Sequence, residues 1–390
     1  MILKDKKILV GITGSIASYK ACDLIRHLQK KGAEVKAIMT PSAKQFVGEL
    51  TIKALTGYEV LSDWKDGETG LEHIYMARWP DSFVIAPASA NTLAKLRIGL
   101  TDNFLTSVAL AYDKPIVIAP AMNTKMLQNP ATQENIKILK ERGYIFVETK
   151  EGILACGEEG VGKLADIEDI ETVILYSIED KPLKDKTVLI SAGGTREYFD
   201  PIRYISNNSS GQMGYALAKM AYVLGAKKVI LISAPTCLRK PYGVEKIDVV
   251  SAEDMYKEVM KYLPEVDIII MNSAVADFKP KTYSKQKLKK AKEKPIVELE
   301  SNPDILKTIG EKKSKNQVLI GFAAESENIL ENAIDKLQRK NLDVIVANKL
   351  NVFSSREHTG IIIFKNREKI EIPPMDKESS ALFILKNVFK

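Results

Sequence analysis

The sequence predicts an α/β protein with two tandem domains, each built on a mostly parallel sheet. Three observations lead to this fold class. The chain has 390 residues, short β-rich runs alternate twice with helical patterns, and a charged segment separates the two series. At about 150 residues per domain, this length accommodates two or three domains with cores of their own. Strands that alternate with helices are typical of βαβ units, in which the strands are parallel.

In the first half, apolar runs predict strands, and the pattern after the first run predicts a helix. The strands are expected at Lys7–Thr13, Glu34–Thr40, Ser82–Pro87, Pro115–Ala119 and Tyr144–Val147, and the helix at Ile16–Lys31. In the second half, strands are expected at Thr187–Ala192, Lys228–Ser233, Asp267–Ser273, Val318–Ala323 and Asp343–Ala347. Helices are expected there at Gly211–Leu224, Ala252–Leu263, Asp304–Lys312, Ser326–Lys340 and Lys377–Phe389, with a hairpin at Ile361–Ile372.

A linker is predicted between the two series. The segment Tyr176–Lys186 is charged, contains Pro182 and lacks apolar periodicity. We therefore expect domains at residues 1–178 and 187–390, joined by a linker at residues 179–186.

Composition excludes several classes of protein. Hydrophobic residues make up 45% and charged residues 27%, which is ordinary for a globular protein and too apolar for a disordered one. No stretch approaches the ~20 apolar residues of a membrane span, and Met1–Val10 has a strand pattern rather than that of a signal peptide. The three cysteines, Cys22, Cys156 and Cys237, cannot form a disulfide framework. We expect a protein of the reducing cytoplasm.

The net charge of +7 is concentrated in one segment. Between Lys279 and Lys294 there are eight lysines and one acid, Glu293, while the remaining residues balance. This distribution argues against a uniformly basic surface that coats nucleic acid. The segment could be a solvated face, an arm for nucleic acid or a lid that clamps phosphates. It carries one aromatic residue, Tyr283, which is weak support for base stacking.

Small and polar residues follow the predicted strands of the first half. Gly11–Ala17 ends the first strand and opens a helix, so its backbone N–H groups could approach a phosphate, although it lacks the G-x-G-x-x-G spacing. Thr40–Ala43, Ala86–Thr92 and Ala119–Asn123 follow the next strands. The carboxyl ends of parallel strands converge on one crevice, which would suit a phosphorylated planar cofactor. Taken singly, each loop could equally be a turn or a helix cap.

The second half has two comparable segments. Ser191–Glu197 follows a strand and leads through Asp200–Gly214 into a helix. It could be a stretched Rossmann loop that binds a nicotinamide, but no Tyr-x-x-x-Lys pair stands in the right place. Asn272–Pro280 leaves another strand, and Asp277 could contact a nucleotide or hold Mg²⁺.

These motifs resemble known families. Gly11–Lys20, His73, Pro87–Thr92, Pro120–Asn123 and Ala155–Gly162 resemble the flavin-dependent cysteine decarboxylases, and the second half resembles the phosphopantothenate–cysteine ligases. Over essentially the whole chain, the order of motifs resembles the bacterial bifunctional decarboxylase–ligases of coenzyme A biosynthesis. The resemblance implies CTP-dependent ligation of cysteine to 4′-phosphopantothenate through an acyl-cytidylate. Decarboxylation of 4′-phosphopantothenoylcysteine to 4′-phosphopantetheine, with FMN, would follow.

For the first domain, the resemblance implies a flavodoxin-like or Rossmann-like flavoprotein decarboxylase. His73, one of three histidines, would be the active-site base, Asn123 would hold the departing carboxylate, and Cys156 would donate a proton to the enethiol intermediate. His73 could otherwise be a surface histidine at a helix start. The family often has Arg where this chain has Lys163, which keeps the charge and loses the bidentate fork. The residues implied to bind FMN are Gly14, Ser15, Ile16, Ser42, Ser89, Asn91, Thr92 and Met122.

For the second domain, the resemblance implies a Rossmann-like ligase. Asn207, with Arg203 nearby, would assist conversion of the acyl-nucleotide intermediate, Lys287 would be a catalytic and nucleotide-contacting lysine in a lid, and Asp277 would hold Mg²⁺. The residues implied to bind CTP are Met271, Asn272, Ser273, Asp277, Lys287, Pro303, Asp304, Ile305, Leu306, Phe322, Lys336 and Lys340.

The partners implied are small molecules, with no nucleic acid and no membrane. The resemblance also implies a homo-oligomer with trimeric decarboxylase domains and dimeric ligase domains, which together can close a dodecamer. Two alternatives remain open from the sequence. The first domain could be a decarboxylase or prenyltransferase relative with another substrate, or a non-catalytic flavin-binding regulatory module. The choice between CTP and ATP, feedback control and transfer of the intermediate between domains are also open.

Overall fold

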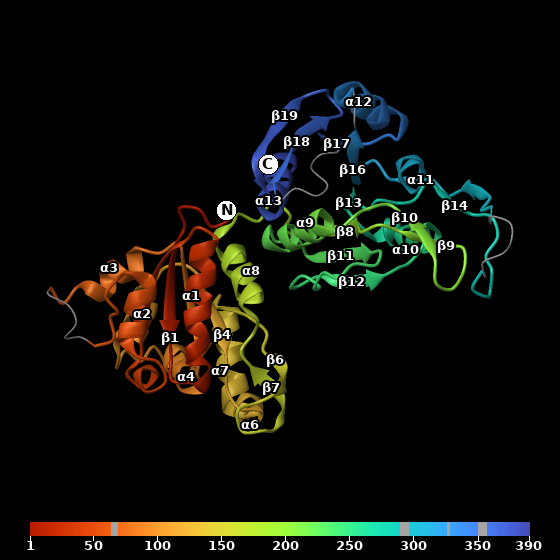
Figure 1. Ribbon diagram of the computed structural model, residues 1–390. Helices are drawn as coiled ribbons and strands as arrows, with labels where there is room; N and C mark the ends of the chain where they lie inside the picture. The colour runs from red at the N-terminus through yellow and green to blue at the C-terminus, as the bar shows by residue number, and fades with distance from the viewer. Residues whose placement is uncertain (64–68, 289–295, 326–327, 350–356) are drawn as a thin grey trace. The chain divides into compact units, whose positions relative to one another are not determined.

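The computed structural model describes residues 1–63, 69–288, 296–325, 328–349 and 357–390. The chain divides into two compact units, Met1–Glu179 and Asp180–Lys390 (Figure 1). Each unit is built on one mainly parallel sheet, so the α/β fold class predicted from the sequence is confirmed.

The first unit contains a five-stranded parallel sheet in the order β2-β1-β3-β4-β5. The interior strand β1 is buried along its whole length except at Lys7, as expected for a parallel strand that is covered on both faces. All five predicted strands are present. Their bounds are β1 Lys7–Ile12, β2 Glu34–Met39, β3 Ser82–Ala88, β4 Ile116–Pro120 and β5 Ile145–Phe146.

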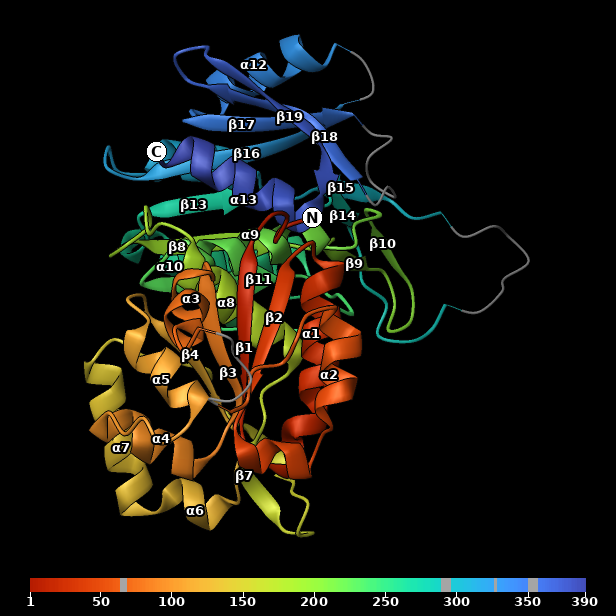
Figure 2. The same ribbon diagram turned by 90° about the vertical axis from the view of Figure 1, so that its left-hand side faces the viewer.

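Helices cover both faces of this sheet. On one face, α1 packs through Ala21, Leu24, Ile25 and Leu28, whose spacing forms one apolar helix face. On the other face, α5 contributes Leu105, which closes on Gly11 of β1. Figure 2 shows β1, β2 and β3 between α1 and α5. The helices are the 3-10 helices η1 Ile16–Tyr19 and η2 Pro41–Gln45, and α1 Lys20–Lys30, α2 Glu49–Thr56, α3 Glu72–Arg78, α4 Ala90–Ile98, α5 Phe104–Ala111, α6 Thr124–Gln128, α7 Pro130–Glu141 and α8 Ile167–Ile178.

An antiparallel hairpin stands apart from this sheet. Its strands are β6 Lys150–Ile153 and β7 Glu159–Lys163. Gly157 in the turn has a φ of 84°, a left-handed conformation that glycine adopts without steric cost. The glycine-rich segment that carries Cys156 is therefore an ordered turn at the end of a hairpin.

The second unit contains an eight-stranded sheet in the order β12-β11-β8-β13-β16-β17-β18-β19. The strands from β12 to β17 are parallel, and β18 and β19 form the predicted antiparallel hairpin. The sheet strands are β8 Thr187–Ala192, β11 Lys228–Ser233, β12 Glu245–Asp248, β13 Ile268–Met271, β16 Val318–Glu325, β17 Val344–Lys349, β18 Glu357–Phe364 and β19 Lys369–Asp376.

The helices of the second unit match the predicted ones closely. They are α9 Gln212–Val223, α10 Ala252–Tyr262, η4 Leu263–Glu265, α11 Ile305–Lys312, α12 Ile329–Arg339 and α13 Lys377–Val388. Two short ribbons were not predicted. They pair β9 Arg196–Tyr198 with β10 Tyr204–Ser206, and β14 Phe278–Pro280 with β15 Leu299–Ser301.

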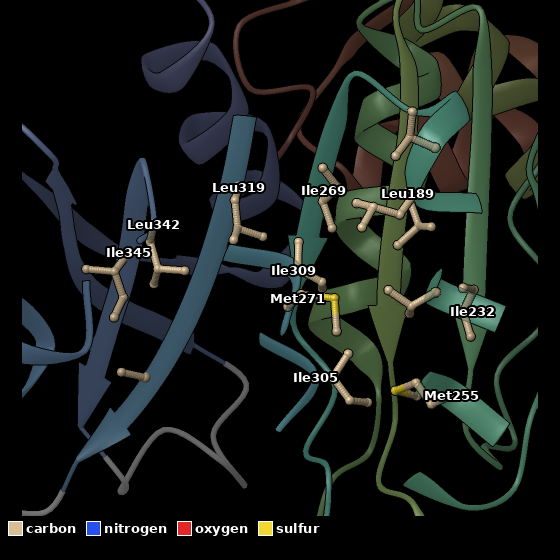
Figure 3. Packing of buried hydrophobic residues seen from close by; sticks show 14 of the residues in the cluster. Leu189, Ile232, Met255, Ile269, Met271, Ile305, Ile309, Leu319, Leu342 and Ile345 are labelled. Atoms are coloured by element: carbon tan, nitrogen blue, oxygen red, sulfur yellow. The ribbon is translucent and has the colours of Figure 1, made fainter. Parts of the chain in front are cut away.

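The core of the second unit lies between its sheet and α10, α11 and α12 (Figure 3). Leu189 and Ile269 on neighbouring strands pack with Met255 of α10 and with Ile305 and Ile309 of α11. Each fully buried side chain of this size stabilises the fold by roughly 1.5–3 kcal/mol. This packing holds the first turn of α11 against the carboxyl edge of the sheet.

The segment predicted as a linker is partly ordered against the second unit. Leu183 is buried, its N–H donates to the carbonyl of Leu224 at 3.1 Å, and Lys184 bridges Ala226. The apolar side chain of Leu183 explains this docking. The sequence pattern missed it because a single leucine in a charged segment shows no periodicity.

Candidate functional site

The first candidate site lies at the carboxyl edge of the five-stranded sheet. From β1 the chain passes to β2 on one side and later to β3 on the other, so the strand order reverses between β1 and β3. In open α/β sheets, ligands bind outside the carboxyl ends of the strands at such a point. The loops that the sequence singled out follow β1, β2, β3 and β4 at this edge.

Buried Thr13 ties the first of these loops to the third. Its hydroxyl donates to the carbonyl of Pro87 at 2.8 Å and accepts from the Ser89 N–H at 2.9 Å. Ser89 in turn caps α4 by accepting from the Thr92 N–H at 3.3 Å. The α4 helix therefore begins at the carboxyl edge of the sheet, and a helix N-terminus stabilises an anion. Asn91 and Thr92, both predicted to bind FMN, lie in the first turn of α4.

Gly14 and Ser15 lie where the other loops meet. A Cβ at Gly14 would come within 2.6 Å of the Ser42 Cβ, so only glycine allows these two loops to touch. The Ser15 hydroxyl caps the helical segment by accepting from the Ala17 N–H at 3.3 Å, and it lies 3.4 Å from the carbonyl of Ala121. Hydroxyls and helix N-termini from four loops thus form a cradle whose chemistry fits a flavin phosphate.

A cavity of about 490 Å³ opens beside this cradle. Ser15 and Ile16 line one side of it, Met122 and Asn123 another, and Cys156 a third. Lys163, which stands where the resemblance implies arginine, also lines it. The structure therefore brings the predicted catalytic residues Asn123 and Cys156 to the same cavity as three of the predicted FMN residues.

Asn123 and Cys156 are in direct contact. The Asn123 side-chain oxygen caps α6 by accepting from the Lys125 N–H at 2.8 Å, which turns its amide N–H₂ outward. That group donates to Cys156 Sγ at 3.4 Å and to Glu158 Oε2 at 3.2 Å. The Cys156 thiol lies 3.7 Å from the same carboxylate oxygen. A thiol and an amide donor are thus held together at an exposed hairpin tip.

Glycines fix the β6–β7 hairpin against the loop that carries Asn123. Gly162 has a φ of 123°, and a Cβ there would lie 2.3 Å from the Met122 carbonyl. The Met122 N–H donates to the Gly162 carbonyl at 3.0 Å, and the Thr124 hydroxyl donates to Val161 O at 2.6 Å. This close approach sets the position of the hairpin relative to Asn123.

His73 lies apart from these residues. It is half-buried in the first turn of α3 and does not line the cavity that Asn123 and Cys156 share, among the residues described. Its neighbours Leu71 and Tyr75 are 50% and 56% exposed. The first unit thus brings Asn123 and Cys156 together without His73.

The second candidate site is a cavity of about 680 Å³ at the carboxyl edge of the eight-stranded sheet. It brings together Asn207 and all the residues predicted to bind CTP except Lys287. These are Met271, Asn272, Ser273, Asp277, Pro303, Asp304, Ile305, Leu306, Phe322, Lys336 and Lys340.

Side chains from other segments of the chain hold the residues that follow β13 in place. The buried Ser191 hydroxyl accepts from the N–H groups of Asn272 and Ser273, both at 3.1 Å. The Thr195 hydroxyl accepts from the Ala276 N–H at 2.9 Å, and the Asn302 amide donates to the Ala276 carbonyl at 2.9 Å. Four hydrogen bonds therefore hold the backbone of this segment in place at the cavity.

Charged groups line the cavity at α11 and α12. Asp304 caps α11 by accepting from the Lys307 N–H at 2.9 Å and forms an ion pair with Lys340. Burial alone would raise the pKa of Asp304, but the hydrogen bonds from Lys340 and the Lys307 N–H hold that pKa below its usual range. Lys336 donates to the carbonyl of Phe322 at 2.9 Å.

Asp277, the predicted Mg²⁺ ligand, is exposed at the cavity. The described residues contain no group of three or more His, Cys, Asp or Glu side chains that could hold a metal ion. A single carboxylate fits Mg²⁺ held mainly by substrate phosphates and water, which is the usual arrangement for this ion.

Asn207 reaches the same edge from the loop before α9. Its amide donates to the carbonyl of Val275 at 3.0 Å. A Cβ at Gly194 would lie 2.6 Å from the Asn207 carbonyl, so the glycine pair after β8 gives this loop its close approach. Asn207 is thereby held next to the segment predicted to contact nucleotide.

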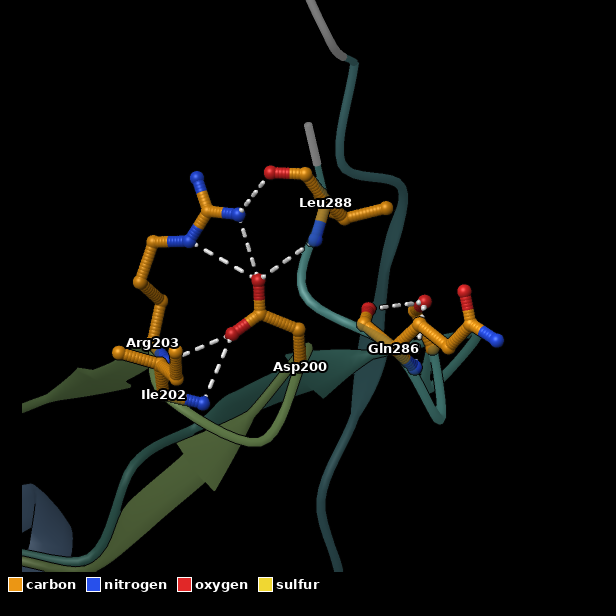
Figure 4. Close-up of polar contacts among 6 residues, drawn as sticks. Asp200, Ile202, Arg203, Gln286 and Leu288 are labelled. Atoms are coloured by element: carbon orange, nitrogen blue, oxygen red, sulfur yellow. Dashed lines mark hydrogen bonds and ion pairs between the residues drawn. The ribbon is translucent and has the colours of Figure 1, made fainter. Parts of the chain in front are cut away.

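Arg203 lies outside this cavity and holds the lysine-rich segment (Figure 4). Its guanidinium contacts Asp200 Oδ2 at 2.9 and 2.5 Å and donates to the carbonyl of Leu288 at 2.7 Å. The Leu288 N–H donates to the same Asp200 carboxylate at 3.2 Å. The pair thus binds both backbone groups of the residue that follows Lys287.

Hydrogen bonds also set the charge state of Asp200. Burial alone would raise its pKa, but hydrogen bonds from Ile202, Arg203 and Leu288 hold the pKa well below its usual range. The carboxylate is therefore ionised throughout the neutral range, and the clamp on Leu288 stays intact there.

The start of the lysine-rich segment is only partly neutralised. Lys279 lies 3.5 Å from Glu300, and Lys281 lies 3.3 Å from Glu298. Lys287 is exposed and forms no ion pair within the part of the chain that the structure describes. Residues 289–295, which include four of the lysines in this segment, lie outside the described residues.

The structure adds residues that the sequence did not assign. Gln212 at the start of α9, His358 of β18 and Lys377 at the start of α13 also line the second cavity. Gln212 stands in the polar string before α9 that the sequence singled out. His358 and Lys377 showed no local motif because strand pairing and helix packing bring them to the site.

No helix among the described residues has the length and apolar character needed to span a membrane.

Comparisons with known proteins agree with the two units. Residues 2–179 match the Flavoprotein family, and residues 183–390 match the family described as the DNA/pantothenate metabolism flavoprotein C-terminal domain. The chain is 44% identical to the coenzyme A biosynthesis bifunctional protein CoaBC of Bacillus subtilis (strain 168), over 99% of this chain and 97% of that protein. It is 34% identical to the protein of the same name from Escherichia coli (strain K12), over 100% of this chain and 98% of that protein.

The crystal structure of the C-terminal domain of a coenzyme A biosynthesis bifunctional protein CoaBC is 42% identical, with a TM-score of 0.47, and covers 54% of this chain and 96% of that one. The structure of a PPC decarboxylase mutant is 35% identical, with a TM-score of 0.40, and the match covers 44% of this chain and 98% of that one.

Proposed function

The chain belongs to the family of coenzyme A biosynthesis bifunctional proteins called CoaBC, and from this premise we propose what each of its two sites does. The protein is a bifunctional enzyme of coenzyme A biosynthesis, with a flavoprotein decarboxylase domain and a ligase domain. We propose that the second domain joins cysteine to 4′-phosphopantothenate with CTP. The first domain then decarboxylates the product to 4′-phosphopantetheine with FMN.

The cradle at the β1–β3 switch point supports the assignment of FMN. Ser15, Ser89 and the N–H groups of the helix turns that they cap would hold the cofactor's phosphate, and Met122 would lie beside it. When bound, FMN supplies the redox chemistry that makes loss of carbon dioxide from the cysteine moiety possible.

The polar pair at the hairpin tip supports roles for Asn123 and Cys156. The Asn123 amide presents an N–H donor to a carboxylate without transferring a proton to it, so the departing group stays ionised. The Cys156 thiol lies 3.7 Å from Glu158 Oε2 and would serve as the proton donor at this end of the cavity. These residues would hold and protonate substrate at one end of the cavity.

The exposed apolar side chains around His73 support completion of this site by a second copy of the chain. Leu71 and Tyr75 flank His73 on α3 and are half exposed. Burial of such side chains favours association. We propose that the decarboxylase domains form trimers in which His73 faces the Asn123–Cys156 pair of a neighbouring copy.

The second cavity supports nucleotide-driven ligation. A carboxylate is a poor electrophile, so it must first become a mixed anhydride by attack on the nucleotide α-phosphate, after which the cysteine amine displaces the nucleotide monophosphate. Lys336, Lys340 and Lys287 would offset the negative charge of both steps, with Mg²⁺ held at Asp277. Asn207, fixed next to Val275, would orient the acyl-nucleotide. Dimeric ligase domains complete the proposed assembly.

One observation carries this proposal most directly. The cavity of the second domain collects Asn207 and almost the whole predicted nucleotide set from five separate segments of the chain. A direct test is to measure pyrophosphate release with CTP or ATP as the only nucleotide, in the presence of 4′-phosphopantothenate and cysteine. CTP-dependent release is expected, and release supported equally by ATP would contradict the assignment of CTP.

A further inference from the structure

A second cluster of polar side chains lies in the ligase cavity at the first turns of α9 and α13. We propose that Lys377, together with Gln212 and His358, forms a phosphate-binding subsite of this cavity, which takes the pyrophosphate end of the nucleoside triphosphate. The proposal rests on the ligase function proposed above and assigns a role to residues that it leaves unused.

The charge balance of the cavity lysines points to Lys377. Among the described residues that line the cavity, Lys340 forms an ion pair with Asp304, and Lys336 donates to a backbone carbonyl. The Lys377 ammonium donates to Gln212 Oε1 at 3.1 Å, and this neutral amide is its one hydrogen-bond partner within the described part of the chain. Lys377 therefore presents a positive charge to the cavity that no carboxylate there offsets.

The neighbouring acid is already engaged in the helix cap. Asp376 accepts from the Ser379 N–H at 2.9 Å and from the Ser379 hydroxyl at 2.8 Å. Burial lowers the pKa of Lys377, and a half-buried ammonium of this kind gains most from a bound anion. The charge of Lys377 is thus available for a ligand.

His358 adds a neutral donor beside this charge. It is 3% exposed, and its Nδ1 lies 2.7 Å from the Ser380 hydroxyl. Burial, and then the charge of Lys377, lower the pKa of His358 to about 4, so its ring is neutral at pH 7. When Nδ1 accepts the Ser380 hydroxyl proton, the ring proton is on Nε2, which can donate to a phosphate oxygen.

The backbone at the start of α9 has the shape that a phosphate requires. Gly211 has a φ of 75°, and a Cβ there would lie 3.3 Å from the Gly193 N and 2.8 Å from the Thr236 side chain. This contact holds the glycine-rich turn after β8 against the N-terminus of α9, whose free N–H groups favour an anion. Side-chain charge and backbone donors therefore converge on the same end of the cavity.

The test compares Lys377→Gln with two matched variants in the full-length protein. Lys377→Arg keeps the charge. Lys219→Gln removes the ion pair between Lys219 and Glu378, at 2.7 Å, and so loosens the contact between α9 and α13 without removing a cavity residue. Binding of inorganic pyrophosphate is measured by calorimetry, and initial rates of ligation are measured with CTP or 4′-phosphopantothenate varied. Circular dichroism verifies that each variant folds.

Lys377→Gln is expected to weaken pyrophosphate binding and raise the KM for CTP by about tenfold or more, as loss of one charge-assisted hydrogen bond predicts. Lys377→Arg and Lys219→Gln should stay near the parent protein. If the KM for 4′-phosphopantothenate rises instead, the subsite binds the substrate phosphate and the nucleotide assignment is overturned. Unchanged pyrophosphate binding and unchanged KM values would overturn the subsite itself. Absence of CTP-dependent ligation in the parent protein would refute the proposed function separately, since the pyrophosphate measurement requires no turnover.

Discussion

The two domains share an architecture but assemble their candidate sites differently. In the second domain, one cavity contains almost every residue predicted to bind nucleotide. These residues come from β13 and the segment after it, the start of α11, β16 and the last turn of α12. In the first domain, Asn123 and Cys156 share a cavity while His73 lies on α3 outside it. The described residues of the second domain thus gather most of its predicted nucleotide set in one cavity, whereas those of the first domain do not bring His73 to the cavity of Asn123 and Cys156.

The β6–β7 hairpin of the first domain explains part of this difference between the two sites. Cys156 lies at the tip of the β6–β7 hairpin, which is attached to the domain through Gly162 and the loop at Asn123. A group carried on such an arm can face outward toward another copy of the chain. Of the residues predicted to bind nucleotide in the second domain, Met271 and Ile305 instead belong to its buried core.

The largest expected effect comes from removing the thiol of the first site. Cys156→Ser should lower decarboxylation by at least about 100-fold, as loss of a positioned proton donor predicts, while ligation changes by less than about twofold. Carbon dioxide and pyrophosphate release are measured on the same preparation. Cys237→Ser, which alters another exposed cysteine, is the matched control. Equal loss of both activities would show that the two sites do not act separately.

An effect of similar size, on ligation instead of decarboxylation, is expected for the lysine-rich segment. Lys287→Gln should lower ligation by about 100-fold, because it removes a cation from an anionic transition state, and should leave decarboxylation intact. Lys281→Gln in the same segment, where the lysine already pairs with Glu298, should change ligation by only a few fold. Ligation by Lys287→Gln at the parent rate would refute the role of this lysine.

A smaller effect is expected from the clamp that holds Leu288. Asp200→Asn weakens the contacts to Arg203 and the Leu288 N–H, so the segment should be cut faster by trypsin and ligation should fall by about tenfold. If the clamp acts by positioning Lys287, combining Asp200→Asn with Lys287→Gln should cost no more than Lys287→Gln alone. Additive losses would assign Asp200 a role independent of Lys287.

The pH dependence of this clamp follows from its charge. The folded-state pKa of Asp200 lies below the value of about 3.9 for an unfolded aspartate. Its contribution to stability is therefore fully present above that value and is lost as the pH falls through the folded-state pKa. Denaturation midpoints of the parent and of Asp200→Asn should differ by a constant amount between pH 6 and 8 and converge only in strong acid.

The smallest effect is expected at Lys163. Arginine there would form a bidentate contact with a substrate phosphate, so Lys163→Arg should lower the KM for 4′-phosphopantothenoylcysteine by a few fold without changing kcat. Lys20→Arg, at another lysine that lines the same cavity, is the matched control. An unchanged KM would show that Lys163 does not contact the phosphate.

Much of this structure could be predicted from the sequence because its signals are local. Apolar runs such as Lys7–Ile12 fix the strands, and the loops after them carry the site residues. The role of Arg203 could not be predicted, since its partner Leu288 is 85 residues away. His358 and Lys377 were missed for the same reason, because only sheet pairing and helix packing bring them to the cavity.

The separation of the two sites can be tested most directly in one assay with the full chain. The purified protein, with flavin bound, is given 4′-phosphopantothenate, cysteine and CTP, and pyrophosphate and carbon dioxide are measured together. We expect one equivalent of each per 4′-phosphopantetheine formed, and neither product when CTP is omitted. A protein that cannot be loaded with flavin, or one that releases no pyrophosphate under these conditions, would contradict the account.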